Sequence, residues 1–182
     1  MVKEPRAGRV KTRLGLEIGM TAAAWWYRHQ VRSLLRRLRD PRWDIVLAVS
    51  PDRSVLGRDW PSDLWRMPQG GGDLGTRMAR AFGCSRGPGV LIGSDIPGVS
   101  RGHIAHAFAL LRESASVIGP SEDGGFWLVG FRTPQSVPLT FFQGVRWSHS
   151  ATLSDTLRCF PEPPATADRL SDVDKASDLL RS

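Results

Sequence analysis

Lysine and arginine side chains gather around a glycine near the start of the chain. The stretch KEPRAGRVKTRL, residues 3–14, surrounds Gly8 with the cations Lys3, Arg6, Arg9, Lys11 and Arg13. Cations neutralise an anion, and glycine lets backbone N–H groups approach it, so this composition is typical of a phosphate-binding loop. The spacing is not that of a Walker A loop, GxxxxGK[ST]. A merely basic, solvated segment is the alternative.

An aspartate follows an apolar run in the middle of the chain. Residues 89–95, GVLIGSD, predict a buried strand that ends in Asp95. Ligands of open α/β folds bind at the carboxyl ends of parallel strands. A carboxylate there can coordinate Mg²⁺ that bridges phosphates. The alternative is a turn or a helix cap made by Ser94 or Asp95.

Two glycine-rich stretches are candidate ligand-contacting turns. Residues 121–131, SEDGGFWLVGF, place two acids and two glycines before an apolar strand, which indicates a tight turn open to close approach, or simply a good turn. Residues 70–75, GGGDLG, match the pattern GxGxxG. A clean preceding strand and an acid about 20 residues on are missing, so we reject a dinucleotide site and favour a flexible loop contacting a base or ribose.

Other acids and histidines are weaker candidates. Asp174 precedes a C-terminal helix predicted from about Val173, and is either a second metal ligand or an acid favoured by the helix dipole. The residues alone favour the second reading. His103 and His106 lie three positions apart on one predicted helix, but no third ligand has the spacing of a zinc site.

The elements that must position these residues alternate between helix-like and strand-like runs, which is typical of an α/β domain. The predicted helices are about 17–38, 70–82, 101–113, 149–159 and one from about 173. The predicted strands are 44–50, 64–68, 89–95, 115–119 and 126–131, and residues 1–15 are expected to form a loop. No linker or repeat divides the chain, so a single domain over 1–182 is expected.

Positive charge is concentrated at one end of the chain. The formal net charge is +7; residues 1–39 hold ten Lys/Arg against two acids, a net of +8, and the remainder hold fifteen against sixteen, a net of −1. A local excess disfavours a domain that coats nucleic acid. No apolar run approaches the ~20 residues of a membrane span. The basic N-terminal segment lacks the apolar core of a signal peptide. Cys84 and Cys159 make no disulfide framework, so a protein of the reducing cytoplasm, without a membrane partner, is expected.

Six segments, in order, resemble successive blocks of one known family. They are KEPRAGRVKTRL, QGGGDLGTRMARAF, GVLIGSDIPGVS, VIGPSEDGGFWLVGF, FFQGVRWSHSATLSDTL and LSDVDKASDLL. The family comprises bacterial and archaeal GT-A-type transferases, similar to the molybdenum cofactor nucleotidyltransferases and the phospholactate guanylyltransferase of coenzyme F420 synthesis. Some members are called glycosyltransferases and are associated with radical-SAM genes or arsenosugar synthesis. The resemblance implies a single-domain, Rossmann-like nucleotide-diphospho-sugar transferase fold, with a mostly parallel sheet and helices on both faces.

The resemblance also implies roles for individual residues. The diphosphate or triphosphate would be held by the basic loop, through Lys3, Gly8, Lys11 and Arg13. The base or ribose would be read by Gln69, Gly72 and Asp73, and the acceptor pocket bordered by Asp123, Gly124 and Gly125. Mg²⁺ (or Mn²⁺) would be bound by Asp95 and Asp174, with Asp95 and Lys11 as the catalytic residues.

The implied function is metal-dependent transfer of a nucleotidyl or glycosyl group to a small-molecule acceptor. The donor would be a nucleoside triphosphate or a nucleotide sugar, and the charge of the basic loop slightly favours nucleotidyl transfer. A catalytically inactive nucleotide-binding relative is the first alternative, and a basic nucleic-acid-binding domain is the second.

The chain departs from the family's pattern in two places. Relatives begin with a buried strand several residues long before the lysine of the basic loop, whereas only Met1 and Val2 precede Lys3. We expect the true start to lie upstream; the alternative is that the first strand has been truncated. Lys175 and His149 also differ from relatives and leave the choice of acceptor open.

Overall fold

The chain forms two compact units. A computed structural model describes residues 1–171, 173 and 178. The first unit contains Met1–Pro68 and Gly93–Arg101, with the described part of the C-terminal segment; the second contains Gln69–Ile92 and Gly102–Ser171. The predicted C-terminal helix from about Val173, with Asp174 and Lys175, lies largely outside the described residues.

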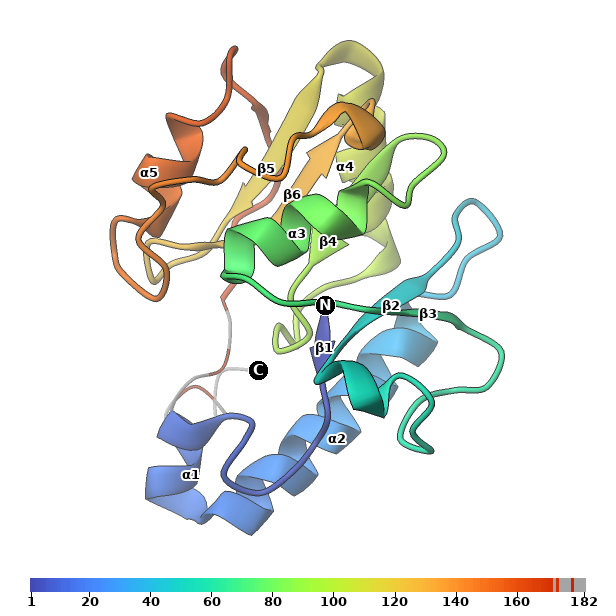
Figure 1. The fold of residues 1–182 in the computed structure, drawn as a ribbon, viewed down its shortest axis with the longest axis vertical. Helices are drawn as coiled ribbons and strands as arrows, with labels where there is room; N and C mark the ends of the chain where they lie inside the picture. The colour runs from blue at the N-terminus through green and yellow to red at the C-terminus, as the bar shows by residue number, and fades with distance from the viewer. Residues whose placement is uncertain (172, 174–177, 179–182) are drawn as a thin grey trace. The chain divides into compact units, whose positions relative to one another are not determined.

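The first unit is built on a parallel sheet of three strands. They are β1 (Val2–Lys3), β2 (Val46–Ser50) and β3 (Trp65–Pro68), in the order β1-β2-β3 (Figure 1). Val2 pairs with Val49, and Val46 with Trp65. The segment expected to be a loop at 1–15 therefore contains a short strand. That strand is two residues long.

Two successive helices follow β1 where the sequence predicted one. They are α1 (Thr12–Ile18) and α2 (Met20–Arg37), drawn in blue in Figure 1. Gly19 separates them because its φ of 92° lies outside the helical region, a conformation that glycine adopts readily. A short 3₁₀ turn, η1 (Asp52–Ser54), follows β2.

The core of the first unit lies between α2 and its sheet. The apolar spacing of α2 predicts one buried face, and this is confirmed: Tyr27, Val31 and Leu35 are each no more than 5% exposed. They belong to one cluster with Val2 and Val49 of the sheet. Each fully buried side chain of this size stabilises the fold by roughly 1.5–3 kcal/mol. This packing fixes the strands from whose ends the candidate site is built.

The second unit contains a mixed sheet in the order β4-β6-β5-β7. Its strands are β4 (Gly89–Ile92), β5 (Ser116–Pro120), β6 (Phe126–Phe131) and β7 (Ala165–Thr166). β7 is parallel to β5, whereas β6 is antiparallel to both of its neighbours. The predicted parallel arrangement therefore holds for the first sheet and for the β5–β7 pair. β4 ends at Ile92, three residues before Asp95.

Helices of the second unit agree with the sequence patterns in number and differ in length. α4 (Arg101–Glu113) has the predicted bounds, whereas α3 (Leu74–Phe82) begins four residues later than predicted. η2 is Pro134–Ser136, and α5 is Thr152–Leu157, shorter than the predicted 149–159. α5 begins at Thr152 because the residue before it, Ala151, has a ψ of 2° and is the N-cap, outside the helical region. In the part of the chain that the structure describes, no helix combines the length and apolar character needed to cross a membrane.

Candidate functional site

The basic loop leaves β1 at Lys3 and turns at Gly8. Gly8 has a φ of 73°, and a Cβ added there would meet nothing within 4 Å. Glycine is thus favoured by the backbone conformation, while the surrounding space is open. The side chains of Lys3 and Arg9 are exposed, whereas Arg6 pairs with Glu4 at 3.0 Å. Exposed cations therefore border an open turn, as a phosphate-binding loop requires.

Lys11 is the most constrained residue of this loop. Its φ and ψ of 44° and 48° place it in the left-handed region immediately before α1. For a residue with a Cβ this conformation costs roughly 1–2 kcal/mol. Its side chain is only 7% exposed, and Nζ lies 2.6 Å from Oδ2 of Asp95. The two residues predicted to be catalytic are therefore in direct contact.

Asp95 lies in the segment that follows β4, within the first unit. Its side chain is 32% exposed, so it is open to a ligand on one side while Lys11 covers another. Its backbone carbonyl accepts a hydrogen bond from the N–H of Val173 at 3.2 Å. Asp174, the predicted second metal ligand, comes next in the sequence and lies outside the described residues.

A buried hydroxyl pair lies beside this ion pair. Oη of Tyr27 accepts the backbone N–H of Lys3 at 3.0 Å and lies 2.7 Å from Oγ of Ser94. Burial raises the pKa of Tyr27, and the nearby charges of Asp95 and Lys11 act on it in opposite directions. Tyr27 thus joins β1 to the residue that precedes Asp95. Sequence patterns gave no signal for this role beyond the position of Tyr27 on the buried face of α2.

The residues around Asp95 can supply only part of the coordination shell of Mg²⁺, and a ligand and water would have to supply the rest. The described residues contain no group of three or more His, Cys, Asp or Glu side chains that could hold a metal ion. Asp95 offers one carboxylate, a hard oxygen donor, and Lys11 already contacts one of its oxygens. Mg²⁺ commonly binds through one or two carboxylates together with substrate phosphates and water. The donor set therefore suits a cation that arrives with a phosphate ligand.

In the second unit, the residues expected to read a base or ribose form the start of α3. The Asp73 carboxylate caps the helix by accepting the N–H of Thr76 at 2.8 Å, and this bond lowers its pKa. The carbonyl of Gln69 accepts from Arg80 at 2.6 Å, and that of Gly72 from Arg77 at 2.9 Å. Asp73 therefore has a structural role here, and its predicted contact with a base or ribose stays a prediction.

The turn expected to border the acceptor pocket is packed against the chain itself. The Asp123 carboxylate accepts the N–H of Gly125 at 2.9 Å. Gly124 has a φ of 85°, and a Cβ added there would overlap the carbonyl oxygen of Ser150. The N–H of Leu153 donates to the carbonyl of Gly124 at 2.8 Å. The close backbone approach that these glycines permit is thus occupied by the segment before α5.

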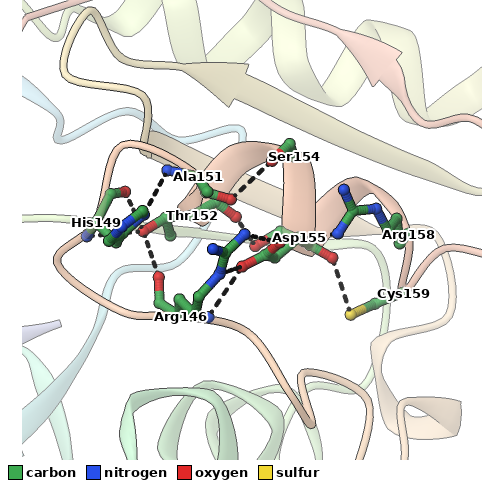
Figure 2. Close-up of polar contacts among 9 residues, drawn as sticks. Arg146, His149, Ala151, Thr152, Ser154, Asp155, Arg158 and Cys159 are labelled. Atoms are coloured by element: carbon green, nitrogen blue, oxygen red, sulfur yellow. Dashed lines mark hydrogen bonds and ion pairs between the residues drawn. The ribbon is translucent and has the colours of Figure 1, made fainter.

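That segment is held by a buried carboxylate. Figure 2 shows Arg146 forming two hydrogen bonds to Asp155, from Nε at 2.7 Å and from Nη2 at 2.9 Å. Arg158 adds a contact at 3.0 Å. Asp155 is 7% exposed, and the bond from Arg146 is the largest cause that holds its pKa well below the usual range. Sequence reasoning missed this cluster because no recognisable motif links residues at these spacings.

His149 has a defined ring orientation in the same segment. Its Nδ1 accepts the backbone N–H of Ala151 at 3.0 Å, as Figure 2 shows. The hydroxyl of Thr152 shares its proton between the carbonyl oxygens of Arg146 and His149, each at 2.7 Å. The neutral ring therefore carries its proton on Nε2. Whether His149 affects acceptor choice stays a prediction.

The fold defines an α/β protein of the nucleotide-diphospho-sugar transferase class. A solved structure from Desulfovibrio desulfuricans G20, described as a "putative nucleotide-diphospho-sugar transferase", matches with a TM-score of 0.81 and 32% sequence identity. The match covers 96% of this chain and 80% of that chain. A search of curated proteins found no significant match.

A family model identifies the chain more closely. Residues 34–149 match the model of DUF2064, described as "Uncharacterized protein conserved in bacteria". The chain belongs to this family. The resemblance to GT-A-type transferases is supported at this level, whereas closer kinship with the molybdenum cofactor or coenzyme F420 enzymes stays a prediction.

Proposed function

We propose that this protein is a transferase that uses a nucleotide-linked sugar as donor and holds its diphosphate at the basic loop. The observation that carries the proposal is the contact between Lys11 and Asp95. A lysine in a strained backbone conformation, with a nearly buried side chain, lies 2.6 Å from a partly exposed carboxylate. Backbone strain of this kind persists where the surroundings enforce it and is concentrated at functional sites. The similarity to the Desulfovibrio protein supports the donor class.

In this mechanism the chain acts by neutralising charge and by positioning. Lys3, Lys11 and Arg13 would contact the diphosphate, whose negative charge grows as the bond to the transferred group breaks. Asp95 would hold Mg²⁺, which supplies further neutralisation of the leaving diphosphate. Fixed charges aimed at a developing anion lower the barrier without a covalent enzyme intermediate. The proposal that Asp123, Gly124 and Gly125 border the acceptor rests on the resemblance to the family.

Nucleotidyl transfer from a nucleoside triphosphate is the second candidate. Lys3 and Arg9 are exposed and have no ion-pair partner within the described residues. Their charge adds to that of Lys11, which Asp95 offsets, and a triphosphate has one more phosphate to use it than a nucleotide sugar. A triphosphate that binds more tightly than every nucleotide sugar, and is consumed with release of pyrophosphate, would favour this candidate. A nucleotide that binds without turnover would instead favour an inactive relative.

The proposal is tested by ligand-induced stabilisation of the full chain. UDP-glucose, GDP-mannose, GTP and CTP are compared with and without Mg²⁺ for wild type, Lys11→Ala and Asp95→Asn. A ligand at ~100 times its dissociation constant adds about 2.7 kcal/mol of stability. We expect a Mg²⁺-dependent increase in Tm with a nucleotide sugar for wild type, reduced in both variants.

Arg6→Ala is the matched control, because Arg6 lies on the same loop and pairs with Glu4 instead of Asp95. It should retain the wild-type response. Equal losses in Arg6→Ala and Lys11→Ala would indicate a non-specific charge effect. If no nucleotide stabilises the cooperatively melting wild type, the proposed function is wrong.

A further inference from the structure

Two buried hydroxyl groups form a directed chain next to Asp95. The backbone N–H of Lys3 donates to Oη of Tyr27 at 3.0 Å, and Oη lies 2.7 Å from Oγ of Ser94. Tyr27 is 4% exposed and Ser94 is 7% exposed. Both side chains are therefore largely shielded from bulk water.

The number of donors limits how the protons in this chain can be arranged. A backbone N–H can only donate, so Oη of Tyr27 is the acceptor toward Lys3. Each hydroxyl has one proton to give, and either hydroxyl can donate to the other. Both arrangements leave one proton without an acceptor among the described residues. Ser94 is the more exposed of the two and precedes the partly exposed Asp95, so we assign the remaining proton to Ser94, with Tyr27 donating to it.

This assignment leaves the proton of Ser94 available. Ser94 is 7% exposed, and the described residues offer its hydroxyl proton no acceptor. The carboxylate of the adjacent Asp95 contacts Lys11 and forms no hydrogen bond to Ser94 in the described structure. A buried donor without a partner, positioned by another residue, indicates a ligand oxygen as its acceptor.

We propose that Oγ of Ser94 donates a hydrogen bond to a phosphate oxygen of the bound diphosphate, with Tyr27 as the residue that orients it. The inference rests on the proposed function and extends it to a neutral donor beside the cations of the basic loop. An anionic oxygen is the acceptor that makes the strongest bond with a hydroxyl proton. Tyr27 does not touch the ligand and acts as a positioning residue.

The test uses inorganic pyrophosphate, which probes the phosphate contacts without a base or sugar. Its affinity for the full chain is measured by calorimetry in Mg²⁺ for wild type, Ser94→Ala, Ser94→Thr and Tyr27→Phe. We expect Ser94→Ala to weaken binding about tenfold, the loss of one hydrogen bond to a charged group. Ser94→Thr keeps the hydroxyl, so its affinity for pyrophosphate should stay within about twofold of wild type. A change of this size is clearly smaller than the roughly tenfold loss expected for Ser94→Ala.

The role of Tyr27 is tested with a double-mutant cycle. If Tyr27 acts only through Ser94, Tyr27→Phe weakens pyrophosphate binding in the wild-type background and has no further effect in Ser94→Ala. Additive losses would overturn the positioning role. Ser116→Ala is the matched control, because Ser116 is equally buried, at 7% exposure, and belongs to the second unit. It should leave the affinity unchanged.

The outcomes separate this inference from the function on which it rests. Wild type that binds neither pyrophosphate nor a nucleotide sugar overturns the proposed function and the role of Ser94 together. Wild type that binds pyrophosphate while Ser94→Ala binds equally well overturns the role of Ser94 alone. Equal losses in Ser94→Ala and Ser116→Ala would assign the effect to general destabilisation and overturn it as well.

Discussion

Lys11 combines an unfavourable backbone conformation with a short ion pair to Asp95. Its φ is 44°, in the left-handed region, and its Nζ lies 2.6 Å from the carboxylate oxygen. Asp95 is tied to its own surroundings through a backbone bond from Val173. The ion pair therefore holds Lys11 in a conformation that a residue with a Cβ adopts at a cost. This relationship predicts that the backbone and the side chain of Lys11 can be tested separately.

Replacing Lys11 by glycine should cost less stability than replacing it by alanine. Both changes remove the ion pair, but only glycine adopts the left-handed conformation freely, a relief of about 1–2 kcal/mol. The greater freedom of glycine in the unfolded chain offsets about 0.5–1 kcal/mol of this. We expect Lys11→Gly to be more stable than Lys11→Ala by about 0.5–1 kcal/mol, measured by urea unfolding.

Ser148 provides the control for the backbone contribution. It is the other non-glycine residue with a positive φ, 55°, within the described residues. Ser148→Gly should therefore show a similar relief relative to Ser148→Ala. If alanine is as stable as glycine at Lys11 while glycine is favoured at Ser148, the strain assigned to Lys11 is wrong.

The ion pairs of Asp155 should make stability depend on pH in the acid range. Arg146 is the main cause that lowers the pKa of Asp155 in the folded protein. A depressed pKa contributes stability that is fully present above the unfolded value, about 3.9, and is lost as pH falls toward the folded value. Asp155→Asn should thus be less stable than wild type at pH 7, and the difference should shrink at pH 3.

Asp44 supplies the comparison for this experiment. It is exposed and has no ion-pair partner among the residues that the structure describes. Asp44→Asn should leave the urea midpoint near that of wild type at pH 7. A difference between wild type and Asp155→Asn that stays constant from pH 7 to pH 3 would show that the carboxylate charge is not the stabilising feature.

Local patterns predicted the elements, whereas long-range pairing decided their arrangement. The spacing of Tyr27, Val31 and Leu35 correctly predicts the buried face of α2, because a 3.6-residue period is a property of neighbouring positions. The direction of β6 could not be obtained in this way. A short apolar run is compatible with parallel or antiparallel partners, and pairing with β4 and β5 selects the second.

The candidate site was predictable only in part, for a related reason. Residue type and resemblance indicated Lys11 and Asp95, and the structure brings them into contact. The hydroxyl chain through Tyr27 and Ser94 joins residues 67 positions apart, so no local pattern could reveal it. The close approach between Gly124 and Ser150 is equally non-local. The sequence indicated a close approach to this glycine, but not that the approaching group is the backbone of Ser150.

The two possible roles of Asp73 can be separated by one pair of variants. Asp73→Ala removes the cap of α3 and should cost about 1 kcal/mol, whereas Asp73→Ser keeps a capping oxygen and should cost little. If Asp73 also reads the base or ribose, Asp73→Ser weakens a nucleotide sugar and leaves pyrophosphate affinity unchanged. If Asp73→Ser binds both ligands as tightly as wild type does, Asp73 only caps α3 and does not contact the nucleotide.

Gly124 and Gly144 allow the steric role of the acidic turn to be measured. Their φ values are 85° and 84°, so alanine suffers the same backbone penalty, about 1–2 kcal/mol, at both positions. A Cβ at Gly144 meets nothing within 4 Å, whereas at Gly124 it would overlap the Ser150 carbonyl. Gly124→Ala should therefore be less stable than Gly144→Ala by a further 1–3 kcal/mol or so, the usual cost of overpacking. Urea unfolding of the two variants measures this difference. Equal stabilities would mean that the turn and the segment before α5 are not packed together, and would restore Gly124 as an open position for an acceptor.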